Sequence, residues 1–430
     1  MEKVKQPVVI VIGGGPAGLM AAGTAAFFGS KVLLLEKNAR CGQKLLLTGS
    51  GKCNITNRAP LELFLDQFAE NKKFLYPAFK GLFYDELETF FNRHHVFFQT
   101  EENGKVFPST KTAADVLSAL LDYCSENHVD IHNSEPVTAI ERMQSDEDDR
   151  QHWRVITEKT VYEAGSIILA TGGLSYPRTG STGDGYSLAK SFSHTIVSTR
   201  PALVPVEVAE PWCKALSGIS LKGVAVGLYR ESQSHASQKL AEQKDDLLFT
   251  HFGLSGPAIL FLSRWLPDHF EEQSPLQTFA ATVDLFPMRT AEELEKDLLR
   301  FIASTPLRML KTILNKEFDI PLAVASALVS HLGFKEDISG QEITKEKRKL
   351  LLSALKSLRF PLSKTRGYRE AMVTAGGVST KEIRPQSMES KLVPSLFFAG
   401  EVIDIDGYTG GFNLQAAFST GCLAGKSASQ

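Results

Sequence analysis

Three glycines and one carboxylate near the start of the chain have residue types and a spacing that suit the binding of a phosphate and a ribose. Gly13, Gly15 and Gly18 follow an apolar run from Val8 and lead into an alanine-rich segment. The first permits a tight turn, the second lets backbone N–H groups approach a pyrophosphate, and the third lets a helix pack closely on a sheet. Glu36 ends a second apolar run, 18 residues beyond Gly18, where a carboxylate accepts hydrogen bonds from a ribose. This pattern predicts a strand, turn and helix that bind a dinucleotide.

A second group of such residues lies near the end of the chain. A short apolar run leads into Gly400 and Glu401, and a glycine pair that ends at Gly411 precedes a helical pattern. In FAD-binding Rossmann proteins an acid in this place reaches the ribityl hydroxyls, so we expect this role for Glu401. The N-terminus of the following helix contributes roughly 0.3 to 2 kcal/mol toward negative charge on the flavin pyrimidine. Because a nicotinamide-binding domain does not need this return of the chain, the sequence predicts FAD rather than NAD as the bound dinucleotide.

Two further segments complete the predicted cofactor site. The apolar run at residues 166–169 leads to Thr171 and Gly172. This pattern matches the strand, followed by glycine, that passes the adenine side in FAD proteins with a two-segment cofactor domain. Residues 41–57 are rich in small and donor residues, and we expect them to follow the pyrophosphate and the isoalloxazine edge. In this loop Lys52 either stabilises the reduced flavin electrostatically or is a solvated surface lysine. The predicted cofactor-binding residues are Gly13, Gly15, Pro16, Ala17, Gly18, Glu36, Lys37, Lys44, Thr48, Ser50, Gly51, Asn54, Val137, Thr171, Gly172, Gly400, Glu401, Gly411, Phe412, Asn413 and Leu414.

The composition argues against several other classes of protein. The chain has 430 residues, of which 43% are hydrophobic, and a formal net charge of −2, which suits two or three domains with sizeable cores. Its five cysteines form no C-x-x-C pair, so we predict neither a disulfide framework nor a metal site. The wide spacing of Cys41 and Cys53 argues against a flavin disulfide reductase. No apolar run reaches the length of about 18 residues that spans a bilayer, and we expect a cytoplasmic protein without membrane association.

The order of these segments predicts an α/β fold in which an insertion interrupts a Rossmann-like FAD-binding domain. We assign residues 1–193 and 361–430 to the FAD-binding domain. Residues 194–288 contain alternating apolar and polar segments and predict a small β-barrel or sandwich. Residues 289–360 carry apolar residues at helical spacing and predict a helical subdomain. The predicted helix N-caps of this subdomain are Thr290, Thr305 and Thr344.

Six strings in this order cover essentially the whole chain: GGGPAGLMAA, CGQKLLLTGSGKCNITN, ATGGLSYPRTGSTGDGY, LLFTHFGLSGPAIL, TAGGV and FAGEVIDIDGYTGGFNLQAAFSTG. They resemble the BaiN/RdsA-like family of bacterial FAD-dependent flavoproteins. The resemblance implies a glutathione-reductase-like FAD domain with an inserted β-barrel and a helical subdomain. It also implies an oxidoreductase, and the activities linked to the family include reduction of a ribosomal RNA uridine to dihydrouridine and a proposed role in bile acid dehydroxylation.

The cofactor motifs do not choose among substrates. We expect reduced flavin to pass hydride to an unsaturated substrate, with a uridine of large-subunit ribosomal RNA as the leading substrate and a steroid-like or other small enone as the alternative. NAD(P)H is the expected electron donor, and we expect it to bind transiently because the sequence has no second Rossmann fingerprint. A non-catalytic protein stabilised by FAD is the remaining alternative, and the oligomeric state stays open.

Residues outside the cofactor motifs are candidates for contact with the substrate. His251 suits proton delivery to a carbon because histidine ordinarily titrates near neutrality, although structural histidines are commoner. Residues 344–369 include nine basic side chains that offer a face for phosphates, although such a run is often only a solvated helix surface. Further candidates for substrate contact are Tyr176, Arg178, Arg366 and Arg369.

Overall fold

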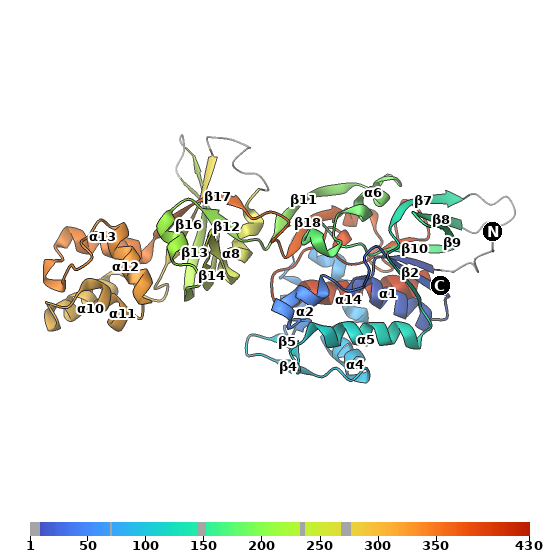
Figure 1. The fold of residues 1–430 in the computed structure, drawn as a ribbon, viewed down its shortest axis with the longest axis horizontal. Helices are drawn as coiled ribbons and strands as arrows, with labels where there is room; N and C mark the ends of the chain where they lie inside the picture. Colours follow the sequence, from blue (N-terminus) through green and yellow to red (C-terminus); the bar gives the residue numbers. More distant parts are fainter. Residues whose placement is uncertain (1–8, 69–70, 144–151, 233–236, 268–276) are drawn as a thin grey trace. The chain divides into compact units, whose positions relative to one another are not determined.

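The computed structural model divides the chain into two compact units (Figure 1). We call them the Rossmann unit, Met1–Pro201 with Ala371–Gln430, and the inserted unit, Ala202–Glu370. The structure describes residues 9–68, 71–143, 152–232, 237–267 and 277–430.

A five-stranded parallel sheet forms the centre of the Rossmann unit. The strand order is β19-β10-β1-β2-β6, and every neighbouring pair is parallel. Strands β1 and β2 are buried at each position, as expected for strands of a parallel sheet covered on both faces. The strand bounds are Val9–Ile12 for β1, Val32–Glu36 for β2, Asp130–Asn133 for β6, Ser166–Leu169 for β10 and Leu396–Phe398 for β19.

Helices from the two ends of the chain pack against each other in this unit. Helix α1 (Pro16–Phe27) follows β1, and helix α14 (Phe412–Ala428) lies along it (Figure 1). Gly421 and Gly425 of α14 permit this contact, because a Cβ on either one would lie 2.3 Å from a carbonyl oxygen of α1. The first and last parts of the sequence therefore share one hydrophobic core.

Smaller sheets and helices complete the Rossmann unit. Two antiparallel three-stranded sheets have the orders β3-β5-β4 and β7-β8-β9, and β11 pairs with β18. These strands are β3 (Thr56–Asn57), β4 (Phe98–Thr100), β5 (Lys105–Pro108), β7 (Val137–Met143), β8 (His152–Thr157), β9 (Val161–Ala164), β11 (Ile196–Ala202) and β18 (Val373–Val378). The helices are α2 (Leu61–Leu65), α3 (Tyr76–Gly81), α4 (Tyr84–Arg93), α5 (Ala113–Glu126) and α6 (Asp184–Lys190), with 3-10 turns that include η1 (Leu45–Gly51) and η7 (Gly400–Val402).

The inserted unit contains a closed six-stranded barrel and a group of helices. The barrel order is β12-β15-β14-β13-β16-β17, and its strands pair antiparallel. These strands are β12 (Val206–Val208), β13 (Ser220–Ser232), β14 (Gln238–Phe249), β15 (Gly253–Ser255), β16 (Gln277–Asp284) and β17 (Leu358–Thr365). The helices are α7 (Pro211–Ala215), α8 (Pro257–Leu262), α10 (Ala291–Ser304), α11 (Leu310–Glu317), α12 (Leu322–His331) and α13 (Lys345–Lys356).

Two of the three predicted N-caps of the inserted helices are confirmed. The Thr290 hydroxyl accepts a hydrogen bond from the Glu293 N–H at 3.2 Å, and the Thr344 hydroxyl accepts one from the Lys347 N–H at 3.3 Å. The prediction for Thr305 is wrong. This residue ends α10, and its hydroxyl donates back to the Phe301 carbonyl, so the next helix begins later, at α11.

The structure moves the predicted domain boundaries at residues 194 and 361. Strand β11 pairs with β18 of the Rossmann unit, so it does not belong to the barrel. Strand β17 lies across the predicted boundary at 361, yet it closes the barrel between β12 and β16. These pairings join segments distant in sequence, and the local pattern around Pro361 does not reveal them. The barrel and the inserted helices also share one hydrophobic cluster.

Candidate cofactor and active site

The carboxyl ends of four neighbouring parallel strands meet at one edge of the Rossmann sheet. Strand β1 ends before Gly13, β2 ends in Glu36, β10 leads to Gly172, and β19 leads to Glu401. Ligands of open parallel sheets bind outside the carboxyl ends of the strands. The four predicted cofactor segments that include these residues are therefore brought to the edge where a cofactor is expected.

In the glycine-rich turn after β1, backbone atoms crowd Gly13 and Gly18 but leave space beside Gly15. Gly13 has a φ of +108°, and a Cβ there would lie 2.5 Å from the Ala170 carbonyl oxygen. A Cβ on Gly18 would lie 1.8 Å from the Gly13 carbonyl oxygen, so a larger residue would push the helix away from the turn. A Cβ on Gly15 would meet no atom within 4 Å. The turn therefore leaves space at Gly15 for the approach of a ligand.

Two helix N-termini begin in these segments without side-chain caps. Helix α1 starts after Gly15, has Pro16 in its first turn and has no acidic residue there. Helix α14 starts after Gly411, whose φ is +94°, and a Cβ on this glycine would lie 2.3 Å from the Thr56 carbonyl oxygen. Uncapped N–H groups and the helix dipole together favour negative charge at both places.

The carboxylate of Glu36 is buried and oriented by backbone groups. It is 6% exposed and accepts hydrogen bonds from the Gly14 N–H at 2.7 Å, and from the N–H and side-chain amide of Asn38 at 2.8 and 2.7 Å. A carboxylate has about four acceptor positions, so about one remains for a hydroxyl. The neighbouring Lys37 pairs with Asp184 at 2.6 Å.

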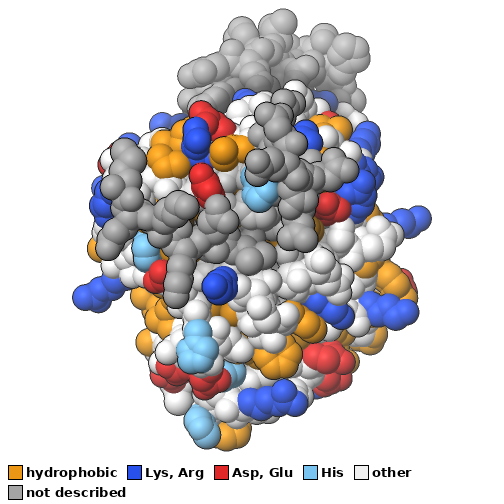
Figure 2. Space-filling model, turned by 90° about the vertical axis from the view of Figure 1, so that its right-hand side faces the viewer, with side chains coloured by type: hydrophobic (Ala, Val, Ile, Leu, Met, Phe, Trp, Pro, Cys, Tyr) orange, Lys and Arg blue, Asp and Glu red, His pale blue; other side chains and the backbone are white. Residues whose placement is uncertain are grey.

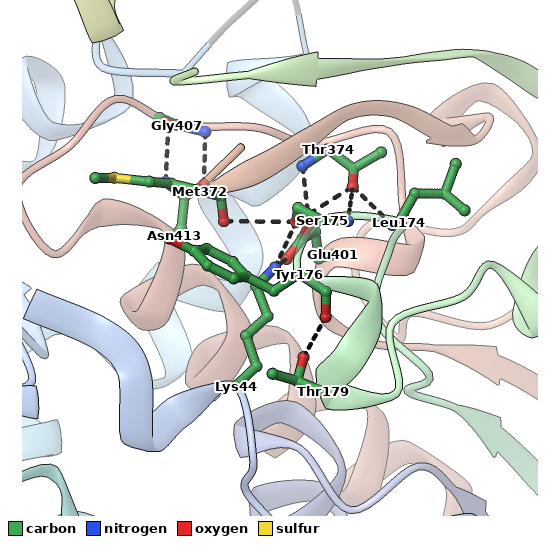
Figure 3. Close-up of polar contacts among 10 residues, drawn as sticks. All are labelled: Lys44, Leu174, Ser175, Tyr176, Thr179, Met372, Thr374, Glu401, Gly407 and Asn413. Carbon is green, nitrogen blue, oxygen red and sulfur yellow. Dashed lines mark hydrogen bonds and ion pairs between the residues drawn. The ribbon is translucent and has the colours of Figure 1, made fainter. Parts of the chain in front are cut away.

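A second carboxylate, Glu401, is the centre of a network drawn from four segments (Figure 3). The Lys44 ammonium lies 2.6 Å from Glu401 Oε2 and also donates to Ser175 Oγ at 2.6 Å. The Ser175 hydroxyl donates to Glu401 Oε1 at 2.8 Å, as does the Thr374 N–H, also at 2.8 Å. The Thr374 hydroxyl in turn accepts the Ser175 N–H at 3.1 Å.

This network keeps the Glu401 carboxylate ionised. Burial alone raises its pKa, but the nearby Lys44 ammonium and the hydrogen bonds from Ser175 and Thr374 outweigh burial and hold the pKa below its ordinary value. The result is a fixed anionic group with about one acceptor position left, at the place predicted for a ribityl contact.

The loop after Lys44 is compact, and its own side chains stabilise it. The Thr48 hydroxyl donates to the Leu45 carbonyl at 2.6 Å, and Asn54 Oδ1 accepts the Val106 N–H at 3.2 Å. Gly51, with a φ of +86°, ends the 3-10 turn η1. The side chain of Ser50 lies outside the described part of the structure. Lys52 is exposed and forms no ion pair with the described residues.

The remaining predicted cofactor residues have packing or backbone contacts in the structure. The Phe412 ring packs on Phe64 with centroids 4.7 Å apart. The Asn413 side-chain amide accepts a hydrogen bond from the Gly407 N–H at 2.8 Å and donates one to the Gly407 carbonyl at 2.7 Å. Thr171 Oγ1 is buried and has no hydrogen-bond partner among the described residues. Val137 begins strand β7, Leu414 packs partly buried in the core, and the Ala17 side chain faces Gly400.

His251 lies in the other unit, in the turn between β14 and β15. Its side chain is exposed and stacks edge-on with Phe252 at a centroid distance of 4.9 Å. The Arg366 guanidinium lies over the Phe252 ring, with its Cζ 4.5 Å from the ring centroid. It also pairs with Glu207 at 2.5 Å and with Glu370 at 2.7 Å. The predicted catalytic residue is therefore free to meet solvent, while Arg366 is held by two carboxylates.

Most of the basic side chains in residues 344–369 are engaged in ion pairs. The ion pairs are Arg348 with Glu295, Lys356 with Asp284, Arg359 with Glu231, Lys364 with Glu207, and Arg366 with both Glu207 and Glu370. Lys345 and Lys349 are exposed and have no ion pair with the described residues. Figure 2 instead shows a face of the Rossmann unit, on which acidic and basic side chains are interspersed among the described residues. Of the predicted basic face, a few lysines of α13 and the exposed Arg369 therefore remain without an ion pair among the described residues.

The sequence predictions missed four members of the network around Glu36 and Glu401. Gly14 and Asn38 donate hydrogen bonds to Glu36, and Ser175 and Thr374 donate to Glu401. Ser175 stands three residues after Gly172, and this place beside a predicted cofactor segment was the available signal. Thr374 opens the TAGGV string of the family resemblance, but no local pattern places it beside Glu401, because β18 meets this site only through tertiary packing. Tyr176 has a left-handed φ of +54°, held by hydrogen bonds from Thr179 to its carbonyl oxygen.

Other kinds of site receive no support from the described residues. No helix there is long and apolar enough to cross a bilayer, and no cluster of metal-ligating side chains occurs there. The five cysteines are free. Burial raises the pKa of the Cys41, Cys53, Cys124 and Cys213 thiols to about 12. These four thiols are therefore protonated and weakly nucleophilic near neutral pH.

Comparison with known protein families agrees with this site. A family model described as the HI0933-like protein Rossmann domain matches residues 7–427. The chain belongs to this family. It is an oxidoreductase of a family whose cofactor is FAD, which confirms the resemblance found in the sequence and removes the non-catalytic alternative.

Curated relatives of the family match almost the full chain. It is 32% identical to a ribosomal RNA dihydrouridine synthase of Haemophilus influenzae, over 96% of both chains. It is 30% identical to a protein of the same name from Escherichia coli, over 96% of this chain and 95% of the relative. It is also 30% identical to a 3-dehydro-bile acid delta(4,6)-reductase of Clostridium scindens, over 98% of both chains.

A solved structure shares the fold at low sequence identity. A 3-ketosteroid-delta4-(5alpha)-dehydrogenase from Rhodococcus jostii matches 100% of this chain over 98% of its own length, with a TM-score of 0.54 and 15% identity. This likeness supports the predicted architecture of a Rossmann-like domain with an insertion.

Proposed function

We propose that this enzyme reduces the C5–C6 double bond of a uridine in large-subunit ribosomal RNA, which gives dihydrouridine. The observation that carries the proposal is the match over 96% of the chain to two relatives named ribosomal RNA dihydrouridine synthase. The exposed lysines Lys345 and Lys349 of α13 support it, because ammonium groups that form no ion pair within the described part of the chain are available to phosphates.

The residues at the carboxyl edge of the Rossmann sheet fit FAD. The space at Gly15 and the uncapped N-terminus of α1 suit the pyrophosphate. Glu36 keeps an acceptor position for the adenosine ribose, and Glu401 keeps one for a ribityl hydroxyl. The uncapped N-terminus of α14, after Gly411, suits the flavin pyrimidine.

The chemistry of the proposed reaction divides between the cofactor and the protein. Reduced FAD supplies a hydride to the electron-poor carbon of the double bond. We propose that His251 supplies the proton to the neighbouring carbon, so that one hydride and one proton add across the bond that is lost. We further propose NAD(P)H as the source of the electrons.

A second candidate substrate is a steroid-like or other small enone. The relative named 3-dehydro-bile acid delta(4,6)-reductase, which matches 98% of the chain, favours it. Its name, like that of the RNA enzymes, describes the reduction of a carbon–carbon double bond. The same hydride and proton additions therefore serve both candidates, and the shape and charge around the reacting bond separate them.

The decisive experiment is deletion of the gene in its host followed by mass spectrometry of nucleosides from purified large-subunit ribosomal RNA. We expect a loss of dihydrouridine that a plasmid with the intact gene restores. A matched plasmid that carries Glu401→Ala should not restore it, because this change removes the centre of the cofactor network.

An unchanged dihydrouridine content in the deletion strain contradicts the RNA proposal. The enone candidate then makes a separate prediction. Enzyme reduced with NADH or NADPH under anaerobic conditions should be reoxidised by a 3-keto steroid with a conjugated double bond, and not by the saturated ketone. The return of the flavin absorbance measures this reoxidation.

A further inference from the structure

The ammonium of Lys44 has a fixed position at the cofactor edge. It lies 2.6 Å from both Glu401 Oε2 and Ser175 Oγ, and the Lys44 and Glu401 side chains are each only 22% exposed. In Figure 3 the Lys44 side chain extends toward Glu401 and Ser175. A charge held in this way acts through less water than a mobile surface lysine, so its electrostatic effect on a bound ligand is stronger.

Lys52, the lysine that the sequence analysis considered for this role, has a different environment. Its side chain is exposed at the end of η1, and it makes no ion pair with the described residues. Solvent and salt screen such a charge, and its flexible side chain samples many positions. The two lysines therefore provide a matched pair of equal charge in one loop.

We propose that Lys44 sets the charge balance of the FAD site: it holds Glu401 ionised and oriented for the cofactor, and it favours the more negative, reduced form of FAD. This proposal rests on FAD binding at this edge, which is part of the proposed function, and is independent of the substrate. Lys44 is in this sense a positioning residue, and Ser175 fixes both members of the pair.

The hydrogen-bond count shows that the network and a ligand are compatible. Glu401 Oε1 accepts from Ser175 and Thr374, and Oε2 accepts from Lys44. Three of about four acceptor positions are thus in use, and one remains for a hydroxyl of the cofactor. Lys44 has three donor positions, of which Glu401 and Ser175 take two, so one also remains for an acceptor atom of the cofactor.

For the Lys44–Glu401 pair we predict opposite effects of two substitutions on the stability of reduced FAD relative to oxidised FAD. Lys44→Met leaves the Glu401 carboxylate without its cation, so the reduced form of FAD is disfavoured. Glu401→Gln leaves the Lys44 cation without its anion, so the reduced form is favoured. We expect about a tenfold change in the ratio of affinities for reduced and oxidised FAD in each direction, which corresponds to about 30 mV in the two-electron midpoint potential.

The test measures the midpoint potential of the FAD-bound protein by equilibration with reference dyes, without any substrate. The expected potential falls in Lys44→Met, rises in Glu401→Gln, and returns near the wild-type value in the double variant. Lys44→Arg, which keeps the charge, should shift the potential least among the Lys44 variants. Lys52→Met is the matched control and should not shift it.

Several outcomes overturn the proposal. These are shifts of the same sign in Lys44→Met and Glu401→Gln, a shift in Lys52→Met as large as that in Lys44→Met, or no shift in either network variant. Should Lys44→Met fail to retain FAD, the Glu401→Gln potential decides: a rise supports the proposal, and a fall or no change contradicts it. Since no substrate is present, a failure of the RNA proposal leaves these potentials unaffected.

Discussion

The Rossmann unit and the inserted unit use charged residues in opposite ways. At the carboxyl edge of the parallel sheet, Glu36 and Glu401 are shielded carboxylates whose oxygens are bound by backbone N–H groups, a hydroxyl and Lys44. On the inserted unit, charges such as Arg359 and Glu231 pair with each other on the surface of the barrel. The first arrangement leaves acceptor positions for a ligand, and the second neutralises charge that sequence reading counted as available to RNA.

The difference follows from topology. Parallel strands that are neighbours in the sheet bring their carboxyl ends together wherever they lie in the sequence, so polar residues just after them converge. Antiparallel barrel strands and amphipathic helices instead place their polar residues across an outer surface, where exposed ion pairs contribute little stability. We therefore expect the cofactor chemistry in the Rossmann unit, and contact of the substrate with exposed residues of the inserted unit stays a prediction.

The largest expected effect tests the turn of the Rossmann unit. Gly18→Ala places a Cβ 1.8 Å from the Gly13 carbonyl oxygen, and we expect a loss of about 1 to 3 kcal/mol or more in the free energy of unfolding. Gly15→Ala meets no atom within 4 Å, so we expect a change within about 0.5 kcal/mol but weaker FAD binding. Urea unfolding of the apoprotein and titration with FAD measure the two effects. Equal destabilisation by both changes would contradict the assignment of Gly15 to ligand approach.

The second prediction tests whether the inserted unit takes part in catalysis. We expect His251→Asn to lower kcat about 100-fold, as for loss of a general acid, while reduction of the bound flavin by NAD(P)H keeps its rate. Stopped-flow absorbance separates these two half-reactions. His331→Asn, which changes another exposed histidine of the same unit, is the control and should leave both rates unchanged. A normal rate of substrate reduction in His251→Asn removes this residue from the mechanism.

The third prediction concerns acid sensitivity of the Rossmann unit. His194 is buried, and burial lowers its pKa despite the opposing effect of Glu382. Because the unfolded chain binds this proton more readily, stability is full above about pH 6.5 and falls as the pH decreases below that value. Between pH 7.5 and 5.5 we expect the unfolding free energy of His194→Gln to fall less than that of the wild type, because the variant has no buried imidazole to protonate. An unchanged pH dependence in urea unfolding would show that His194 binds its proton equally well in the folded and the unfolded state.

The smallest expected effect tests the reduced basic face of α13. We expect the double variant Lys345→Ala/Lys349→Ala to weaken RNA binding modestly and to reduce the slope of log K against log salt by about 1.5. The double variant Lys222→Ala/Lys239→Ala is the control, because these lysines pair with Asp246 and Glu242 at 2.6 and 2.5 Å. Equal slopes for the two double variants would mean that α13 makes no phosphate contacts.

The sequence predicted the parts of the site that depend on local pattern. The glycine spacing from Gly13 to Gly18 and the acid Glu36 at a strand end are readable because each depends on residues a few positions apart in one turn or strand. The network around Glu401 was only half readable. Its carboxylate follows a strand in sequence, but its partners Ser175 and Thr374 come from separate segments that only the folded chain brings together.

The boundaries of the insertion show the same division. A period of two or of 3.6 residues predicted a strand-rich part in residues 194–288 and a helical part in residues 289–360, because this periodicity follows from the geometry of each element. It did not predict the short helices α7 and α8. The closing of the barrel by β17 and the pairing of β11 with β18 depend on hydrogen bonds between distant strands, so local patterning placed both strands in the wrong unit or subdomain.

The sequence by itself determined the class of cofactor, the family and the α/β architecture, because spacing and composition fix local conformation and motif order. The tertiary structure decided which charged groups meet. Lys44 and Lys52 stand eight residues apart in one loop, and only packing gives the first a half-buried carboxylate as partner and leaves the second in solvent. The strength of an electrostatic interaction depends on distance and on the exclusion of water, and both are properties of the folded molecule.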